Sequence, residues 1–172
     1  GGWTINGKQT NQGVVFRLSQ IDYVTVEGRN TLINELGIKT EIDIRENDEA
    51  VNTLPDDLNY YAFHTKSHVF TASKTTIVEF FKVLGNEANY PILFHCEIGT
   101  DRTGMMAFLL NALLGASEEQ LYTDYLYSNF GYIGGSRDME RIADYFTKIN
   151  EAEGDTFAEK TYNYLEQTIG VN

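Results

Sequence analysis

The stretch PILFHCEIGTDRTG, residues 91–104, decides the fold, because it joins a strand pattern to a helix pattern through a short loop. Residues 91–95 form an apolar run that ends in histidine, which predicts a buried parallel strand. Residues 103–114 predict a helix. Backbone N–H groups at a helix N-terminus have no partners within the helix and suit an anion. The sequence therefore predicts an anion site between a strand and a helix.

The loop between strand and helix contains the only cysteine of the chain, Cys96, ahead of Arg102. The positive end of a helix favours the thiolate form of cysteine, which is the nucleophile. Arg102 can donate two parallel hydrogen bonds to phosphate oxygens, which lysine cannot do. This layout predicts a cysteine that attacks phosphorus and forms a phosphocysteine, which water then hydrolyses. The alternative for Cys96 is a buried structural cysteine, and for Arg102 a surface ion pair.

The pattern His-Cys-x-x-Gly-x-x-Arg-Thr-Gly at 95–104 resembles the signature of the cysteine-dependent protein tyrosine phosphatase superfamily. Its Gly-x-Asp-Arg-Thr-Gly ending is similar to the bacterial branch of tyrosine and lipid phosphatases, close to the dual-specificity enzymes. Further segments resemble that branch in order, over nearly the whole chain: GGW at 1–3, NGK at 6–8, VVFR at 14–17, LGIKT at 36–40, IDIR at 42–45 with Glu49 beyond, and DYLYSN at 124–129. The resemblance implies metal-independent phosphomonoester hydrolysis without a cofactor.

The resemblance also implies a role for each residue of the loop. Arg102 would bind the phosphoryl oxygens and the charge that develops on them. The Thr103 hydroxyl would donate to the cysteine sulfur, although from the residues alone it could be an ordinary N-cap. His95 would order the loop and support the thiolate. The residues expected to line the bound phosphate are His95, Glu97, Ile98, Gly99 and Thr100, with Gly99 in a backbone conformation that side chains disfavour.

The proton donor to the leaving group is harder to assign. Many members of the superfamily use an aspartate in the loop before the preceding helix, but residues 65–72 contain no carboxylate. Asp101 is the first candidate, since the resembling branch carries an aspartate proposed to assist proton transfer there; it could instead only brace the loop. His68 is the second candidate. Asp56 and Asp57 could fold over the site, but a polar loop tip is the preferred interpretation.

Two loop residues depart from the branch and affect the predicted substrate. The branch usually carries lysine where this chain has Thr100, and a small or basic residue where it has Glu97. Their replacement weakens the case for a polyphosphorylated lipid, and Glu97 is expected to point outward. Phosphotyrosine in a protein or peptide is the leading substrate, followed by dual-specificity, phosphoinositide or inositol phosphate activity. A phosphate-binding module with weak turnover is the alternative of another class, and phosphate or sulfate could occupy the loop.

Several polar residues outside the loop are expected to brace it. Arg17, Asp43 and Arg45 each end an apolar strand, so they could form an ion-pair cluster under the loop or face the substrate, and the structural role is preferred. Asp124 and Asn129 are also expected to be braces. Residues 134–137, Gly-Gly-Ser-Arg, could supply a mobile rim with one positive charge.

The pattern along the whole chain predicts an α/β fold in one domain, residues 1–172. A central, mostly parallel sheet is expected to be flanked by helices and followed by a C-terminal helical cluster, as in the phosphotyrosine phosphatase-like fold. Besides the unit at 91–114, strands are predicted at 3–5 and 14–17, around a turn near Asn6-Gly7, and at 38–44 and 59–64. Helices are predicted at 25–36 with Thr25 as N-cap, at 73–84 with Ser73 as N-cap, and at 118–128, 137–151 and 157–169. Ser117 with Gln120 and Thr156 with Glu159 fit capping boxes at the starts of two of these helices.

Composition limits the remaining function classes. The net charge of −12 argues against nucleic acid and anionic membrane surfaces as main partners. No apolar run approaches the roughly 20 residues of a membrane span. One cysteine excludes an internal disulfide and a multi-cysteine metal site. Because the chain opens without methionine, an upstream signal could have been removed, and the sequence leaves the compartment open.

Overall fold

Four parallel strands form the central sheet, which confirms the predicted α/β fold. The computed structural model describes residues 2–5, 7–46, 48–55, 57–131 and 133–172. The sheet order is β3 (Val15–Leu18), β6 (Ile92–His95), β4 (Thr40–Asp43) and β5 (Asn59–Ala62). Leu18 and Asp43 both lie opposite His95, so the ends of β3 and β4 flank the start of the loop at 96–100.

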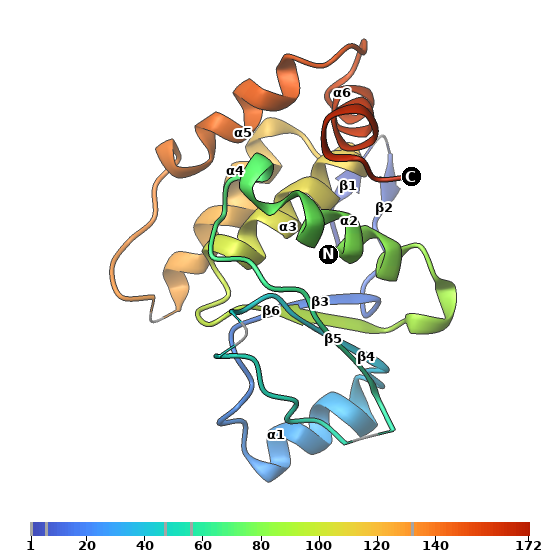
Figure 1. The fold of residues 1–172 in the computed structure, drawn as a ribbon, viewed down its shortest axis with the longest axis vertical. Coiled ribbons are helices and arrows are strands. Elements are labelled where there is room, and N and C mark those ends of the chain that lie inside the picture. The colour runs from blue at the N-terminus through green and yellow to red at the C-terminus, as the bar shows by residue number, and fades with distance from the viewer. Residues whose placement is uncertain (1, 6, 47, 56, 132) are drawn as a thin grey trace.

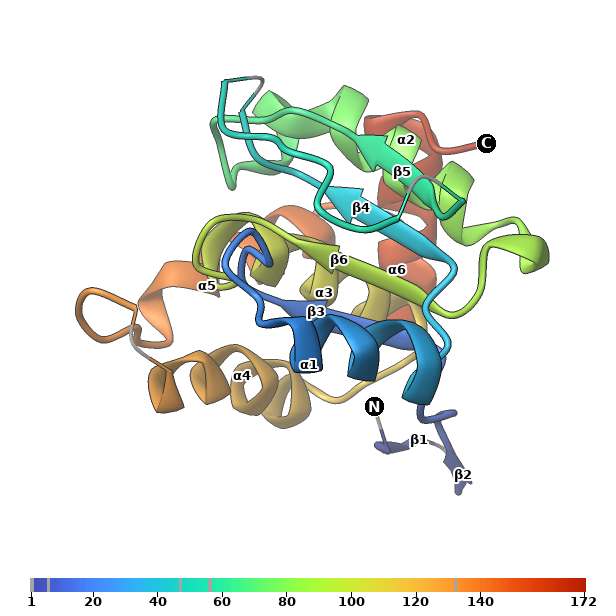
Figure 2. The ribbon, with the colours of Figure 1, turned by 90° about the horizontal axis from the view of Figure 1, so that it is seen from below.

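Helices cover both faces of the sheet (Figure 1). One face packs against α1 (Val26–Asn30) and its π-helical continuation Thr31–Glu35, around the buried residues Ile21, Leu32, Ile38, Leu54 and Leu93. The other face carries the larger core, which is built with α2 (Lys74–Leu84), α3 (Asp101–Leu113), α4 (Glu118–Leu126), α5 (Glu140–Asn150) and α6 (Phe157–Asn163). Figure 2 shows α1 alone on its side of the sheet.

Helix α3 runs through the middle of the larger core, as its apolar sequence predicts. Eight of its side chains or backbone positions are buried, and Phe108 packs edge-to-face against Tyr145 and Phe146 of α5. This packing fixes the helix N-terminus, and therefore the loop that precedes it, relative to the sheet. Short helical turns complete the structure at Phe70–Ser73, Glu87–Asn89, Tyr127–Phe130 and Tyr164–Ile169.

The N-terminal strands differ from the prediction. Instead of a pairing between 3–5 and 14–17, β1 (Thr4–Ile5) pairs antiparallel with β2 (Lys8–Gln9), while β3 joins the central sheet beside β6. There Val15 packs against the larger core and Phe16 and Leu18 against the smaller one, so the half-buried strand has apolar contacts on both faces, which a two-stranded hairpin cannot provide. Sequence expectations on Gly1, Asn6 and Asp56 lie outside the described residues.

Capping residues define most helix starts as predicted. Thr25 accepts from the backbone N–H of Gly28, and the capping boxes beginning at Ser117 and Thr156 are both formed. Ser73 precedes α2 but makes no cap: its hydroxyl instead donates to the Ser67 carbonyl oxygen. The predicted cap is therefore wrong, and this hydroxyl orders the β5–α2 loop.

None of the helices in the described ranges has the length and apolar character needed to cross a membrane.

Candidate active site

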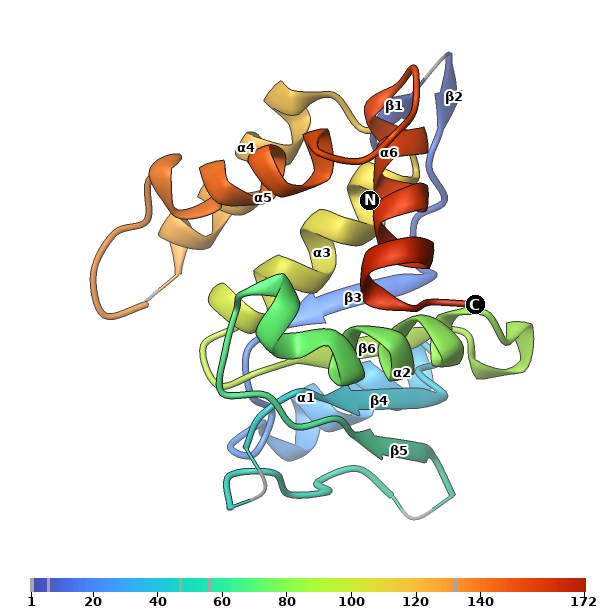
Figure 3. The ribbon, with the colours of Figure 1, turned by 45° about the horizontal axis from the view of Figure 1, so that its top comes forward.

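The loop at 96–100 joins β6 to α3 at the carboxyl edge of the sheet. The connection between α4 and α5 lies at the same end of the molecule (Figure 3). Cys96 follows the last residue of β6 and is 1% exposed, as a free thiol at the base of the loop. The backbone N–H of Gln20 donates to the Glu97 carbonyl oxygen at 2.9 Å, which ties the loop to the segment after β3.

Gly99 allows the loop to turn against β3. Its φ is +73°, the left-handed region that side chains disfavour. A Cβ built there would lie 2.5 Å from the Leu18 carbonyl oxygen and 2.8 Å from the Ser19 nitrogen. Both are backbone atoms at the end of a paired strand, where β3 passes into the next segment, and they cannot move aside cheaply, so the position requires glycine, in agreement with the sequence prediction.

Replacing Gly99 by alanine is expected to destabilise the fold by about 3 kcal/mol, from left-handed strain plus the clash with β3. The loop at 96–100 should shift with it. Gly37→Ala is the matched control, because Gly37 also has a positive φ, +64°, but its Cβ would meet no atom within 4 Å. That variant should lose only about 1–2 kcal/mol. Equal losses in denaturant unfolding of the two variants would contradict the close approach at Gly99.

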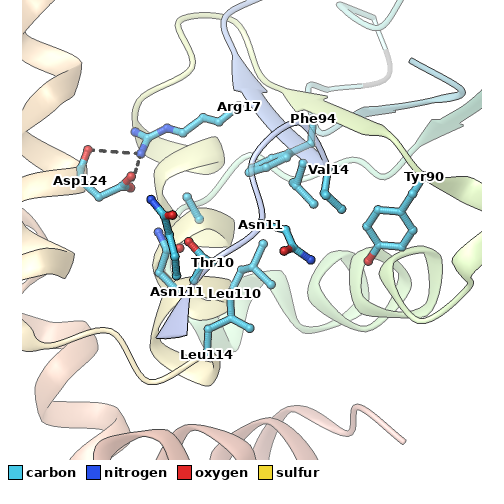
Figure 4. Close-up of a pocket in the computed structure, with 13 residues that line it drawn as sticks. Thr10, Asn11, Val14, Arg17, Tyr90, Phe94, Leu110, Asn111, Leu114 and Asp124 are labelled. Carbon is cyan, nitrogen blue, oxygen red and sulfur yellow. Dashed lines mark hydrogen bonds and ion pairs between the residues drawn. The ribbon is translucent and has the colours of Figure 1, made fainter. Parts of the chain in front are cut away.

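Arg17 braces the outer side of the loop. Its Nε donates to the Gly99 carbonyl oxygen at 3.3 Å, and its Nη1 lies 2.6 Å from Asp124 Oδ2. Its Nη2 donates to Ser128 Oγ at 2.9 Å. Figure 4 shows the contact with Asp124, which reaches Arg17 from α4. The predicted structural role of Arg17 and Asp124 is supported by these contacts.

Two cavities meet at this ion pair. A cavity of about 680 Å³ lies against the outer side of loop residues 97–100 and is bordered by Tyr23 and Tyr127. A cavity of about 450 Å³ lies between the segment before β3 and α3, with Phe94 and Leu110 in its wall (Figure 4). Arg17 and Asp124 line both cavities.

A second, separate ion-pair group lies at the carboxyl end of β4. Arg45 is 1% exposed, and its guanidinium donates to both carboxylate oxygens of Asp43 and to Asp22. Burial alone would raise the pKa of Asp43, but hydrogen bonds from the side chain and backbone of Arg45 outweigh it and hold that pKa below its ordinary value. Arg17 is not part of this group, which corrects the predicted three-residue cluster: β3 and β4 lie on opposite sides of β6.

Arg102 lies in the first turn of α3 with its guanidinium near the mouth of the loop. Its Nη1 is 3.4 Å from Glu49 Oε2 and 3.3 Å from the Thr65 carbonyl oxygen, and its Nη2 is 3.9 Å from Glu97 Oε2. Glu97 is 56% exposed, so it points outward as predicted, yet its carboxylate still reaches Arg102. The acidic partners are exposed enough for an incoming phosphate to replace them.

Asp101 is held by a side chain from the α4–α5 connection. Arg137 donates to both of its carboxylate oxygens, at 3.0 and 2.9 Å, and the Tyr125 hydroxyl donates at 3.4 Å. Burial alone would raise the pKa of Asp101, but the hydrogen bonds from Arg137 outweigh it and lower that pKa, with a smaller contribution from nearby His68. Asn129 bonds the backbone of Arg137 in both directions, which confirms its predicted bracing role.

Three buried polar side chains come from the elements next to the loop: Thr103 of α3, His95 of β6 and Glu41 of β4. The Thr103 hydroxyl is fully buried and has no hydrogen-bond partner among the described residues. His95 Nδ1 lies 3.2 Å from the Cys96 carbonyl oxygen, and His95 Nε2 lies 2.9 Å from Glu41 Oε1. The glutamate contact was missed in the sequence, although Glu41 lies two residues before Asp43 in a predicted strand and therefore on the same face.

The described residues offer one group of side chains that could be considered for a metal. Atoms of Glu41, Asp43 and His95 lie within 4.8 Å of one another. Both Asp43 oxygens, however, accept hydrogen bonds from buried Arg45, and the imidazole nitrogens face Glu41 and a carbonyl oxygen. Apart from Glu41 Oε2, these polar atoms are thus engaged by the protein itself, and the residues fit a hydrogen-bonded ion-pair group better than a metal centre.

Comparison with known proteins agrees with this geometry. A family model described as "Tyrosine phosphatase family" matches residues 1–171. A stretch of 38 residues is 50% identical to a protein of Cupriavidus necator whose name assigns it provisionally to the tyrosine-protein phosphatases. That stretch covers 22% of this chain and 14% of the relative, so the match spans only about one seventh of that protein.

Two solved structures share the fold. TpbA of P. aeruginosa, in complex with phosphotyrosine, has a TM-score of 0.59 and 17% identity over 88% of each chain. The core catalytic domain of the PP-IP phosphatase Siw14 of S. cerevisiae, in complex with citrate, has a TM-score of 0.55 and 20% identity. That match covers 76% of this chain and 80% of Siw14. At these identities the likeness concerns the fold.

Proposed function

Because the chain belongs to the tyrosine phosphatase family, we propose that it hydrolyses phosphotyrosine in proteins or peptides through a phosphocysteine at Cys96. Membership of the family makes it a phosphatase that acts on phosphate esters. The observation that carries the finer proposal is the buried free thiol of Cys96 at the head of a loop closed by Gly99 and followed by Arg102 in the first helical turn. A thiolate, a turned backbone and a bidentate cation are the three requirements of this chemistry.

The reaction proceeds in two displacements at phosphorus. In the first, the Cys96 sulfur forms a bond to phosphorus while the bond to the leaving oxygen breaks, and that oxygen gains a proton. In the second, water attacks phosphorus and the sulfur leaves as thiolate. Arg102 exchanges its contacts with Glu49 and Glu97 for the phosphoryl oxygens. The buried Thr103 hydroxyl donates to the departing sulfur, which lowers the cost of restoring its charge.

Charges at the mouth of the loop favour a singly phosphorylated substrate. Glu49 and Glu97 both lie within 4 Å of Arg102, and Thr100 is neutral and buried. Carboxylates in these positions repel additional phosphates, which an inositol polyphosphate would carry next to the reacting one. Of the two structural neighbours, one is bound to phosphotyrosine and the other is described as a PP-IP phosphatase. The carboxylates of Glu49 and Glu97 favour phosphotyrosine over an inositol polyphosphate.

A substrate panel tests the proposal. With chelator present, the protein is expected to release phosphate from a phosphotyrosyl peptide faster than from the matched phosphoseryl peptide or from inositol hexakisphosphate. Rapid quenching should trap phosphate on Cys96. Preferential turnover of inositol hexakisphosphate would contradict the substrate assignment. Phosphopeptide binding without hydrolysis of even an activated aryl ester would instead indicate a phosphate-binding module. The ionised carboxylate of Asp101 and the carboxylates around Arg102 would then explain the lack of turnover.

Replacing Asp101 by asparagine is expected to slow esters with poor leaving groups far more than activated aryl esters, because only the former need a proton in the transition state. The loss should be about 10²–10⁴-fold for a phenyl ester and small for an activated aryl ester. The measurement is kcat for both esters across a pH series. An equal loss on both esters would remove Asp101 as the proton donor and leave His68 as the next candidate.

A second variant, Arg137→Met, tests the same role of Asp101 by changing its pKa. Arg137 holds the pKa of Asp101 below its ordinary value, so its loss should raise that pKa and keep the acid protonated to higher pH. The falling limb of the kcat profile for poor leaving groups should therefore move to higher pH in this variant. A profile that stays in place would show that the titration of Asp101 does not limit the reaction.

A further inference from the structure

Glu41 and His95 make a fully buried contact on the α1 side of the sheet. The register places Asp43 of β4 opposite His95 of β6, and alternation along the strands brings Glu41 to the same face. Glu41 Oε1 lies 2.9 Å from His95 Nε2, and the two side chains are 1% and 0% exposed. Burying a carboxyl group and an imidazole this deeply costs free energy unless the two groups form a hydrogen bond with each other.

The contacts of the imidazole fix how many protons the pair holds. His95 Nδ1 lies 3.2 Å from the Cys96 carbonyl oxygen. A carbonyl oxygen only accepts, so Nδ1 carries a hydrogen. His95 Nε2 faces a carboxyl oxygen, and two lone pairs would repel each other there. A second proton therefore lies between Nε2 and Glu41 Oε1, and the pair as a whole is electrically neutral.

The neighbouring charges place that second proton on the imidazole. Asp43 is a second carboxylate beside the ring, and it stays ionised because Arg45 donates to both of its oxygens. Arg45 offsets part of the Asp43 charge, and the Tyr60 hydroxyl donates to Asp43 from β5. Between two carboxylates the positive form of the ring is stabilised. Glu41 Oε2 has no hydrogen-bond partner within the described part of the chain, and there His95 is the one side chain that forms an ion pair with Glu41.

We propose that Glu41 is a positioning residue that keeps His95 as an imidazolium, hydrogen-bonded to the Cys96 carbonyl oxygen, and thereby favours the Cys96 thiolate. This inference rests on the proposed function, in which Cys96 is the nucleophile. The charged ring donates a stronger hydrogen bond to the loop than a neutral ring does. Its positive charge is also closer to Cys96 than the negative charge of Glu41, which is reached only through the far nitrogen of the ring.

The first test uses Glu41→Gln. Glutamine has the same length and can donate an N–H to Nε2, but it cannot hold a proton on the ring. Alkylation of Cys96 by iodoacetamide, followed across pH, should slow about tenfold on the acidic side, which corresponds to an upward move of one pH unit in its midpoint. The matched control is Glu79→Gln, which removes one exposed carboxylate from α2 and changes the net charge equally. It should leave the profile unchanged.

The second test observes the protons directly. The chain has three histidines, so nitrogen-15 NMR of the ring nitrogens can be assigned to His64, His68 and His95. Both ring nitrogens of His95 should carry protons at neutral pH in the wild type, and only Nδ1 in Glu41→Gln. This measurement on the wild type decides the question even if the variant fails to fold.

Two results would overturn the inference: an Nε2 without its proton in the wild type, or an unchanged alkylation profile in folded Glu41→Gln. Neither measurement depends on turnover. Failure of the proposed function would appear differently, as a normal His95 signature and a reactive Cys96 in a protein that hydrolyses no phosphate ester.

Discussion

Cys96→Ser is expected to lower the hydrolysis of an aryl phosphate by at least about 10⁴-fold, the scale at which loss of a catalytic nucleophile acts in other covalent enzymes. A serine hydroxyl stays protonated near neutral pH and is a far weaker nucleophile than a thiolate. Serine is close to cysteine in size, and Cys96 is 1% exposed, so the fold should be retained. The measurement is kcat/KM with a chelator present, together with thermal unfolding of both proteins.

Binding separates loss of the nucleophile from loss of the site. The backbone of the loop, Gly99 and Arg102 all remain in the serine variant, so inorganic phosphate should still bind. It should bind more tightly if the thiolate repels it in the wild type, because that negative charge is then gone. Turnover within tenfold of the wild type would mean that another group, or water directly, attacks phosphorus, and the phosphocysteine mechanism would be wrong.

Arg45→Met is expected to destabilise the fold by about 3–5 kcal/mol, because it leaves a buried carboxylate without its cation. Arg45 is the only residue that donates to both oxygens of Asp43 in the described part of the structure, and it also pairs with Asp22. The midpoint of thermal unfolding should fall by about 10 °C for a chain of this size. The matched control, Lys82→Met, removes an exposed ion pair with Glu79 and should cost at most about 0.5 kcal/mol.

The difference in free energy of unfolding between the wild type and Arg45→Met should depend on pH. The pKa of Asp43 is lowered in the folded wild type, so this carboxyl contributes stability above its unfolded value of about 3.9. That contribution is lost as the pH falls through the lowered pKa. The two proteins should therefore approach each other in stability below about pH 4. A constant difference from pH 7 to pH 3 would show that lost packing, rather than an unpaired Asp43, causes the destabilisation.

Local patterns were enough to predict the strand–loop–helix unit, because each part depends on neighbours within a few residues. The apolar run before Cys96 and the turn at Gly99 formed as expected, and the helix predicted from 103 begins two residues earlier, at Asp101. The two capping boxes also formed, since a cap is satisfied inside its own first turn.

The contacts that tune the site depend on strand order and loop conformation, which no local pattern encodes. Glu41 meets His95 only because β4 lies beside β6, and the same order separates Arg17 from Asp43. Arg137 reaches Asp101 from a connection rich in glycine, whose path follows no period. The sequence therefore predicts the candidate reacting residues better than it predicts the residues that control their protonation.

The residues that hold the loop at 96–100 in place come from distant parts of the sequence, and this affects how fast the protein folds. Arg17, Glu41, Glu49, Thr65 and Arg137 all contact residues 95–102. Such distant contacts, added to a parallel sheet, belong to folds with high contact order, which fold slowly because long loops must close first. The loop can reach its final geometry only after the segments on both sides of it in sequence have docked. Recovery of phosphate binding during refolding would then mark the last step of folding, later than the recovery of helix and strand signals.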